Sequence, residues 1–416
     1  MKFEILSVLF LLILIMLGTQ RGSVVYADPS VKDSNLKVEL VTQGLASPTS
    51  MAFIDRNNIL VLEKNSGQVR LISNGILDKQ PILKLNVDHT TLTCCRGLLG
   101  IAVTNSSSPS VFENKPSVLL YYTEKLDKDV RNRVYSYEWN GKSLVTPRLI
   151  LDLPATPGPN HPGGKLVIGL DKYLYTIIGD LNNEGKLQNI KDGPNVTDSS
   201  VILRVNATDG SPAKGNPFSG LSVKMSKYYG YGVRNSFGLA IDPVTGALWD
   251  TENGDKDFDE INLVKPGFNS GWKQLMGPIS KSKISTSDLV NFSHSQYSDP
   301  VFSFTPSLGI TAIDFFNSTK LGDKYYNNLF AGDITHGNLY FFTLNTNRSG
   351  FSFGEDTEHD LLDSVANGEK ELSEVTLGTG FGGITDIMTG PDGFLYVLTF
   401  DQESHGQGKI YRIIHS

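Results

Sequence analysis

Cysteine is nearly absent from this chain: its 416 residues include only two, Cys94 and Cys95, and these are adjacent. An adjacent pair closes no long loop, so it cannot cross-link the fold as disulfides do in small secreted domains. In an oxidising compartment the pair could close a strained eight-membered ring. Two reduced, half-buried thiols are the alternative, and the sequence leaves both interpretations open.

Long hydrophobic runs and several catalytic signatures are also missing. After the first residues, no apolar run approaches the about 20 residues that a membrane-spanning helix needs. No CxxC, HExxH, GxSxG, phosphate-loop or EF-hand pattern occurs, which argues against the zinc, serine-hydrolase and nucleotide-binding classes. The formal charge of −7 argues against nucleic acid as a partner.

The N-terminus has the pattern of an export signal. Lys2 precedes the 13-residue apolar run Ile5–Leu17, and Val25–Ala27 ends like a small-residue cleavage site. We therefore expect residues 1–27 to be a signal peptide, residues 28–416 to be the mature domain, and the protein to be extracellular or at the cell surface. Contact with a membrane is expected only if this segment stays uncleaved.

Asparagine sequons suit such an exported protein. An Asn-x-Ser/Thr sequon marks a possible glycosylation site on an exposed loop. In a chain rich in Asn and Ser, chance explains these sequons equally well. The six are at Asn105, Asn195, Asn206, Asn291, Asn317 and Asn347.

The composition, with 41 glycines, 19 prolines and 10% aromatic residues, is typical of many short strands joined by tight turns. A strand–turn–strand pattern recurs six times, beginning near Met51, Gly97, Lys165, Leu239, Ile310 and Ile384. This spacing predicts an all-β fold, a six-bladed β-propeller with four-stranded antiparallel blades. The strand Leu36–Val41 is expected to pair with Lys409–Ile414 and to close the ring. The polar segments Gly277–Pro300 and Ser349–Gly378 are expected to be surface loops.

One histidine occupies a notable position. His161 lies in a Pro- and Gly-rich turn immediately before an apolar strand, Leu166–Ile168. A second strand, Tyr173–Ile178, follows a tight turn and is expected to run antiparallel, which brings Asp180 back beside His161. A carboxylate beside an imidazole fixes its tautomer and raises its basicity, as a general base requires. A purely structural His–Asp pair is the alternative.

Two further segments are candidates for the same end of the propeller, where loops converge. Arg234 precedes a strand and supplies a fixed, planar cation. A salt bridge to a neighbouring blade is the alternative role for it. The acidic segment Thr251–Asn262 offers carboxylates, and backbone carbonyls around Gly254, as hard oxygen ligands that suit calcium.

Several short motifs resemble those of the soluble pyrroloquinoline-quinone (PQQ) dependent aldose sugar dehydrogenases, the glucose/sorbosone dehydrogenase family of six-bladed propellers. The resemblance extends from Gly44–Pro48 to Tyr411–Arg412. Its most specific pieces are RGLLGIA at Arg96–Ala102, NHPGGKL at Asn160–Leu166, RNSFGLA at Arg234–Ala240, DEINL at Asp259–Leu263 and PGFNSGW at Pro266–Trp272.

The resemblance implies a quinoprotein oxidoreductase. It would oxidise the anomeric hydroxyl of an aldose, or a similar alcohol, by hydride transfer to PQQ, and an external acceptor would then take the electrons. His161 would take the hydroxyl proton, Asp180 would orient His161, and Arg234 would stabilise negative charge on the quinone oxygen.

The resemblance also implies cofactor and metal contacts. The carbonyls of Gly254 and Asp255 would hold a calcium ion that polarises the cofactor, and Glu260 would belong to a nearby calcium or loop-supporting position. The Cys94–Cys95 pair replaces polar family residues and would lie beside the cofactor plane, by analogy with unrelated eight-bladed quinoprotein alcohol dehydrogenases. The implied cofactor contacts are Arg234, Asn235, Gly254, Asp255, Cys94 and Cys95.

The chain departs from the family where the cofactor's carboxylates should bind. The family surrounds the three carboxylates of PQQ with cations from the fifth and sixth blades. Here Asp333–Gly337 (DITHG) lacks the lysine and Gly382–Asp386 (GGITD) lacks the arginine pair, which removes much of the charge-assisted binding. Two alternative hypotheses therefore remain: a non-enzymatic propeller that binds a glycan or a protein, and a calcium-dependent hydrolase such as a lactonase.

Overall fold

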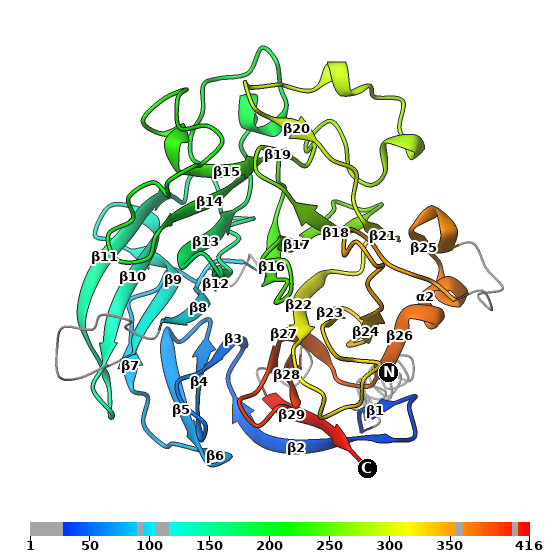
Figure 1. Cartoon of the computed structure of the whole chain (residues 1–416). Helices are drawn as coiled ribbons and strands as arrows, with labels where there is room; N and C mark the ends of the chain where they lie inside the picture. Colours follow the sequence, from blue (N-terminus) through cyan, green and yellow to red (C-terminus); the bar gives the residue numbers. More distant parts are fainter. Residues whose placement is uncertain (1–27, 90–94, 105–115, 355–360, 402–406) are drawn as a thin grey trace, which may run out of the picture.

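The computed structural model describes residues 28–89, 95–104, 116–354, 361–401 and 407–416. In these residues the strands form six sheets around a common centre (Figure 1). One strand of each sheet lies next to the centre: β3 (Pro48–Phe53), β8 (Leu98–Thr104), β12 (Leu166–Ile168), β16 (Ser236–Ile241), β22 (Ile310–Phe316) and β27 (Gly383–Thr389). Each of them begins within a few residues of a predicted repeat, and the prediction of an all-β propeller is confirmed.

The remaining strands extend each sheet outward from its inner strand. The first sheet adds β4 (Asn58–Glu63), β5 (Gln68–Ser73), β6 (Ile76–Leu77) and β7 (Leu83–Lys84). The second adds β9 (Ser117–Lys125), β10 (Val130–Trp139) and β11 (Leu144–Pro154). The third adds β13 (Tyr173–Ile178), β14 (Val201–Asn206), β15 (Tyr228–Tyr231), β19 (Phe268–Asn269) and β20 (Gln296–Tyr297). The fourth adds β17 (Leu248–Asn253), β18 (Asp259–Val264), β21 (Phe302–Thr305) and β25 (Val365–Asn367). The fifth adds β23 (Asn328–Asp333), β24 (Leu339–Phe342), β26 (Thr376–Thr379) and β1 (Ser30–Val31).

The sixth sheet closes the ring with strands from both ends of the chain. It contains β28 (Leu395–Phe400), β29 (Gly408–His415) and β2 (Leu36–Leu45). β2 runs antiparallel to β29, with Leu36 opposite His415 (Figure 1). The predicted pairing of the N-terminal and C-terminal strands is therefore confirmed.

The prediction of uniform four-stranded antiparallel blades is wrong. Only two of the sheets in the described residues have four strands, and β15–β19, β19–β20 and β21–β25 are parallel pairs. Part of the difference comes from the two segments predicted to be loops, because β20 comes from one of them and β25 and β26 come from the other, whereas β6, β7 and β19 lie outside both segments. These insertions pair with the outer edges of neighbouring sheets and so satisfy exposed backbone groups there.

Helical structure is sparse. Within the described ranges the only α-helix is α2 (Glu369–Val375), accompanied by short 3₁₀ turns at Lys186–Gln188, Met225–Lys227, Ile279–Lys281, Thr286–Asp288 and Leu361–Asp363. No helix in this part of the chain is long and apolar enough to cross a bilayer. The predicted signal peptide, residues 1–27, lies outside the described residues.

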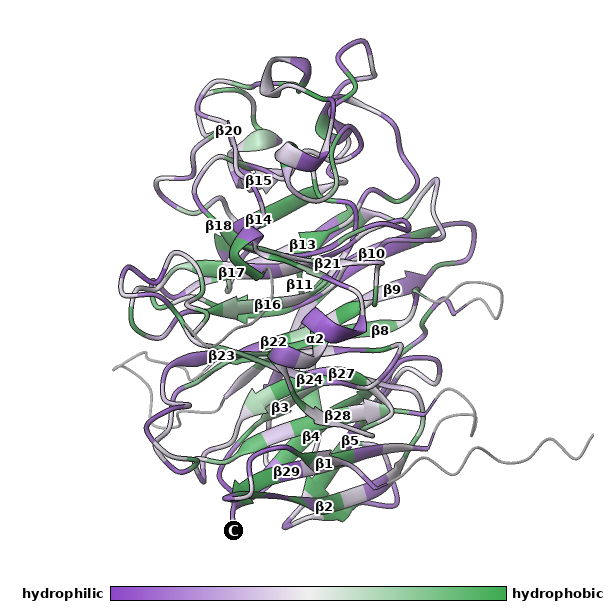
Figure 2. Cartoon of the chain, turned by 90° about the vertical axis from the view of Figure 1, so that its right-hand side faces the viewer, coloured by the Kyte–Doolittle hydropathy of each residue, from purple (hydrophilic) through white to green (hydrophobic). Residues whose placement is uncertain are grey.

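Hydrophobic side chains fill the space between neighbouring sheets. Leu99 and Tyr121 of the second sheet pack with Leu174 of the third, for example, and Trp249 of the fourth packs edge-on against Phe315 of the fifth. Six such clusters join successive sheets around the whole ring of described strands. Figure 2 shows the apolar strands between more polar loops. The sheets thus form a stable scaffold, and the loops at their ends can carry function.

Candidate active site

The turn that carries His161 has an unusual backbone conformation. His161 has a φ of 59°, in the left-handed region that non-glycine residues rarely adopt. Gly163 has a φ of 62°, and a Cβ atom there would lie 2.5 Å from the carbonyl oxygen of Ile177, so only glycine fits. The backbone nitrogen of Gly163 also donates to Oδ1 of Asn235 at 3.3 Å. The turn is therefore packed against both β13 and the segment that contains Asn235.

The side chains of His161 and Asp180 are in contact, as predicted. Nδ1 of His161 lies 2.7 Å from Oδ1 of Asp180. Asp180 is buried, and its Oδ2 accepts a hydrogen bond from Nε1 of Trp272 at 2.8 Å. Because an ionised carboxylate only accepts hydrogen bonds, we assign the imidazole proton to Nδ1, which leaves the Nε2 lone pair available.

Trp272 is a site residue to which the sequence did not assign a role. Besides its hydrogen bond to Asp180, its indole ring lies 5.3 Å from the guanidinium carbon of Arg234. The PGFNSGW motif was a signal for this residue. Nothing in its spacing placed Trp272 beside Asp180, however, because 92 positions separate the two.

Arg234 is held at the edge of the same site. Its Nη1 donates to the carbonyl oxygens of Asn253 at 2.9 Å and Gly254 at 2.8 Å. Its Nη2 lies 3.3 Å from Oδ1 of Asp255. The backbone nitrogen of Arg234 donates to Oε1 of Glu252 at 2.7 Å. The end of β17 and the loop after it therefore fix the position of this cation.

A cavity of about 750 Å³ brings these groups together. All six sheets contribute to its wall through their inner strands or the adjoining residues, for example Thr49, Phe237 and Thr385. Five of the predicted site residues line it: His161, Arg234, Asn235, Gly254 and Cys95. Asp180 lies behind His161. Cys95 is disulfide-bonded, and the other cysteine, Cys94, lies outside the described residues.

The cavity wall from the fifth and sixth sheets is uncharged. It consists of Ser307, Gly309, Thr311, Ile334, Thr335, Thr385 and Phe400. The carboxylates of this region serve the protein itself, because Asp333 accepts hydrogen bonds from the backbone of its own turn and from the hydroxyl of Tyr340. The sequence-based expectation that this side lacks cations therefore holds for the described residues.

The sequence analysis missed two lysines that line the cavity from the other side, Lys64 and Lys165. Nζ of Lys165 lies 2.5 Å from Oδ1 of Asp386 and 3.2 Å from Oγ of Ser50, so its charge is already balanced. Arg234 is likewise held by Asp255 and two carbonyls. The residues that line the cavity thus do not fit a ligand with three carboxylates, since most of their cations are already partnered.

The residues predicted to bind calcium do not form one site. The carbonyl of Gly254 faces Arg234, and the side chain of Asp255 is 65% exposed. Asp255 does not line the cavity. Glu260 does not line it either, because its position in β18 places it in the interior of the sheet, directly opposite Glu252. Its Oε1 accepts a hydrogen bond from the backbone nitrogen of Gly277 at 2.6 Å. Glu260 therefore supports the loop at Gly277, which is one of the two roles expected for it, and a calcium ion at the carbonyls of Gly254 and Asp255 stays a prediction.

Glu260 belongs instead to a row of buried acidic side chains on β17 and β18, with Glu252 and Asp250. Burial raises the pKa of Asp250 to about 8 and that of Glu260 to about 7, and it raises the pKa of Glu252 well above its usual value. Neither carboxylate oxygen of Asp250 has a hydrogen-bond partner in the described part of the chain. These oxygens have the chemistry that calcium prefers, but no three acidic, His or Cys side chains of the described residues form a metal-binding group. The hydrolase hypothesis, which needs such a group, gains no support.

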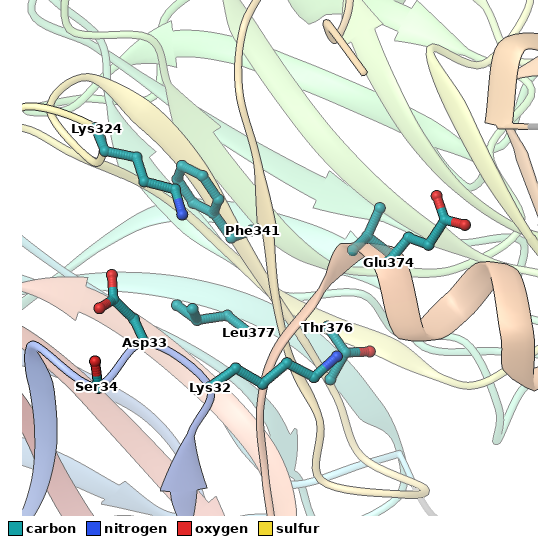
Figure 3. Close-up of a pocket in the computed structure, with 9 residues that line it drawn as sticks. Lys32, Asp33, Ser34, Lys324, Phe341, Glu374, Thr376 and Leu377 are labelled. Carbon is teal, nitrogen blue, oxygen red and sulfur yellow. The ribbon is translucent and has the colours of Figure 1, made fainter. Parts of the chain in front are cut away.

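A second, smaller cavity lies at the outer edge of the fifth sheet and shares no lining residue with the central cavity. Figure 3 shows the residues that line it. Its volume is about 470 Å³. Its polar groups are used within the protein: Nζ of Lys32 donates to the carbonyl of Ser373 at 2.6 Å, and Asp33 accepts from the hydroxyl of Tyr325 at 2.7 Å. Lys324 lies over the ring of Phe341. No predicted site residue contributes to it, so the central cavity is the candidate active site.

The fold and the site define a class: all-β propellers with a His–Asp pair at a central cavity. The sequence signature described as Glucose / Sorbosone dehydrogenase matches residues 45–412. The chain belongs to the glucose/sorbosone dehydrogenase family, which confirms the resemblance of its motifs.

Individual relatives match over nearly the full length. The chain is 26% identical over 392 residues to an aldose sugar dehydrogenase of Escherichia coli, covering 93% of this chain and 94% of that protein. A structure from Thermus thermophilus, described as a putative glucose dehydrogenase, is 28% identical with a TM-score of 0.69, covering 91% of this chain and all of that one. The PQQ-bound aldose sugar dehydrogenase of Streptomyces coelicolor has a TM-score of 0.65 at 23% identity, covering 92% and 99%. This last similarity supports the fold alone.

Proposed function

We propose that the protein is a dehydrogenase that oxidises the anomeric hydroxyl of an aldose, or a similar alcohol. One observation carries the proposal: His161 lines the central cavity and contacts Asp180 at 2.7 Å. With its proton on Nδ1, His161 can accept the substrate's hydroxyl proton at Nε2. Family membership makes oxidation, rather than another base-catalysed reaction, the first choice.

The reaction removes one proton and one hydride from the substrate. His161 would accept the hydroxyl proton at Nε2, and a redox cofactor held in the same cavity would supply the acceptor for the hydride that leaves with the C–H electron pair, so that an aldose would become a lactone. The two electrons then pass to an external acceptor. PQQ is the candidate that family membership suggests, and the partnered cations of the described lining predict that this chain binds it weakly. Arg234, fixed beside Trp272, is positioned to face negative charge in the cavity.

Calcium is part of the proposal only under one condition. An ion at the carbonyls of Gly254 and Asp255 requires Arg234 to release the Gly254 carbonyl that it now contacts at 2.8 Å. A cation there would act as a Lewis acid toward a bound carbonyl compound. Adding calcium should therefore change ligand affinity and Arg234 conformation together.

We also propose that the protein is exported, that it is glycosylated and that its propeller has six blades. Six sheets with hydrophobic clusters between them support the blade count. A disulfide at Cys95 suits an oxidising compartment. Of the sequons in the described residues, four have an exposed asparagine: Asn195, Asn291, Asn317 and Asn347. N-terminal sequencing of secreted protein should begin at Asp28, and glycosidase treatment should lower its apparent mass.

Turnover is the direct test of the proposed activity. Purified protein with PQQ and calcium should reduce an artificial electron acceptor with at least one aldose. His161→Ala should lower kcat by about 10²–10⁴-fold, while His415→Ala, at an exposed position of β29, should not. Circular dichroism should show that both variants are folded. Absence of turnover, with no PQQ binding at micromolar concentration, would refute the proposal.

The second candidate is a non-enzymatic propeller that binds a glycan. The uncharged wall of Thr311, Thr335 and Thr385 favours it, because hydroxyl groups bind sugars well without holding a cofactor's carboxylates. Glycan binding that is unaffected by His161→Ala, in a protein without turnover, would select this candidate.

A further inference from the structure

One cation of the central cavity is without an acidic partner among the described residues. Four side chains that line the cavity carry or can carry positive charge: Lys64, His161, Lys165 and Arg234. Asp180, Asp386 and Asp255 respectively balance the last three. Within the described residues, Nζ of Lys64 has only a long contact, 3.5 Å from the carbonyl oxygen of Arg96.

The backbone fixes the position of Lys64. A Cβ atom on Gly97, whose φ is 142°, would lie 2.6 Å from Cγ of Lys64 and 2.5 Å from its carbonyl oxygen. Glycine at this position therefore leaves room for the lysine stem against the backbone of the second sheet. The backbone nitrogen of Leu98 donates to the Lys64 carbonyl at 3.0 Å. The backbone and the first part of the Lys64 side chain are thus held between two neighbouring sheets, and the residue lines the cavity.

Such an amine has an energetic need for an anion. Burial lowers the pKa of Lys64, which shows that its charge is incompletely compensated. A carboxylate that enters the cavity would gain a charge-assisted hydrogen bond without first displacing an internal partner. Lys165 and Arg234 would have to give up contacts for the same purpose.

We propose that Lys64 is the carboxylate-binding residue of the cavity and receives one carboxylate of the bound ligand. The inference rests on the proposed function, since it names a ligand for the same site. Anion recognition in this chain would then take place at the first sheet, and not at the fifth and sixth sheets, where the wall is uncharged. One available amine suits one carboxylate, which either a quinone cofactor or an acidic sugar such as a hexuronate can supply.

Calorimetric titration of the full mature chain distinguishes the two sources. The probes are PQQ, galacturonate and galactose, and the last two differ only in whether C6 is a carboxylate. Lys64→Met keeps an unbranched side chain that is one atom shorter, and it removes the charge. It should weaken binding of PQQ, or of galacturonate, by about 10–100-fold. Galactose binding should not change. The probe whose binding weakens identifies the source of the carboxylate.

Two variants control for structural effects. Lys64→Arg should retain most of the affinity, because it keeps the charge. Lys142→Met, at an exposed turn that does not line the cavity, should change nothing. The inference is wrong if Lys64→Met leaves every affinity unchanged or weakens galactose equally, or if neither PQQ nor galacturonate binds the native protein. Because binding is measured, failure here is distinct from absence of turnover.

Discussion

The two walls of the central cavity have opposite chemistry. The wall from the first four sheets carries His161, Arg234, Lys165 and Lys64, whereas the fifth and sixth sheets contribute hydroxyl, apolar and glycine positions. The charged wall is organised by partners outside the cavity, such as Asp180 behind His161. Behind the uncharged wall, Asp333 and Asp314 accept hydrogen bonds from neighbouring backbone nitrogens, and Asp386 pairs with Lys165 of the charged wall.

This difference separates two parts of the proposed function. Proton transfer depends on the charged wall, where the His–Asp–Trp chain is complete. Retention of an anionic cofactor would depend in the family on the opposite wall, where this chain has Thr335 and Thr385. We therefore expect substitutions behind the charged wall to lower kcat strongly. Cations introduced on the uncharged wall should raise the affinity for an anionic cofactor.

The largest effect is expected at Asp180. Asp180→Asn removes the charge that holds the Nδ1 proton of His161, so kcat should fall on the order of 10³-fold with a smaller change in KM. Trp272→Phe removes only the donor to the second carboxylate oxygen and should have a weaker effect. Steady-state kinetics over a range of pH measures both.

A matched control is Asp209→Asn, in an exposed turn. It should leave kcat and its pH profile unchanged. Equal activity of Asp180→Asn and native protein would show that the His–Asp pair is structural, which was the alternative interpretation of the sequence.

The next effect concerns the ion pair that joins the two walls. Lys165 and Asp386 have side chains that are 12% and 1% exposed, so Lys165→Met leaves a buried carboxylate without its counter-ion. The free energy of unfolding should fall by about 3 kcal/mol. Urea denaturation measures it, and Lys165→Arg should recover part of the loss.

An exposed pair provides the contrast. The side chains of Lys281 and Asp363 are 49% and 45% exposed, so Lys281→Met should cost less than about 1 kcal/mol. If the two methionine variants lose the same stability, the pair between the walls does not act as a buried salt bridge.

Local sequence signals predicted much of this molecule. The turn and hairpin patterns located the inner strand of each sheet, and the hairpin from Leu166 to Ile178 was enough to place Asp180 beside His161. Closure by the two terminal strands followed from their patterns and from the need to cover sheet edges. These features depend on short-range alternation and turn chemistry, which a sequence displays directly.

Contacts between distant sheets could not be predicted in the same way. Lys165 and Asp386 are 221 residues apart, and nothing local to either one indicates the other. The position of Glu260 depends on strand register, since a shift of one residue reverses the face on which a side chain lies. The parallel pairs β19–β20 and β21–β25 each include a strand from an insertion whose polar composition resembles that of an ordinary loop.

A gain of affinity is expected on the uncharged wall. The double variant Thr335→Lys/Thr385→Arg places cations in the two segments where the resemblance leads us to expect them, and it should bind PQQ about 10–100-fold more tightly than the native protein. Thr335→Met/Thr385→Leu adds bulk without charge and should show no gain. Calorimetry measures the affinities. Equal binding by the two double variants would show that charge does not limit cofactor binding on this wall.

The smallest expected effect is on the pH dependence of the free energy of unfolding. It involves Asp314, whose carboxylate lies behind the uncharged wall. Burial, together with the charge of nearby Asp386, raises the pKa of Asp314 to about 7, although the nitrogen and hydroxyl of Thr389 donate to its Oδ2. An acid with a raised pKa destabilises the fold as pH rises from its unfolded value near 4 toward 7, because the unfolded chain ionises first. Asp314→Asn keeps an acceptor for Thr389 and removes the ionisation. The variant should therefore gain stability relative to the native protein as the pH rises from 4 to 8. Thermal unfolding at both pH values measures this gain. If the two proteins instead differ in stability by the same amount at both pH values, Asp314 is already ionised at low pH. The carboxylates behind the uncharged wall would then be better compensated than their burial indicates.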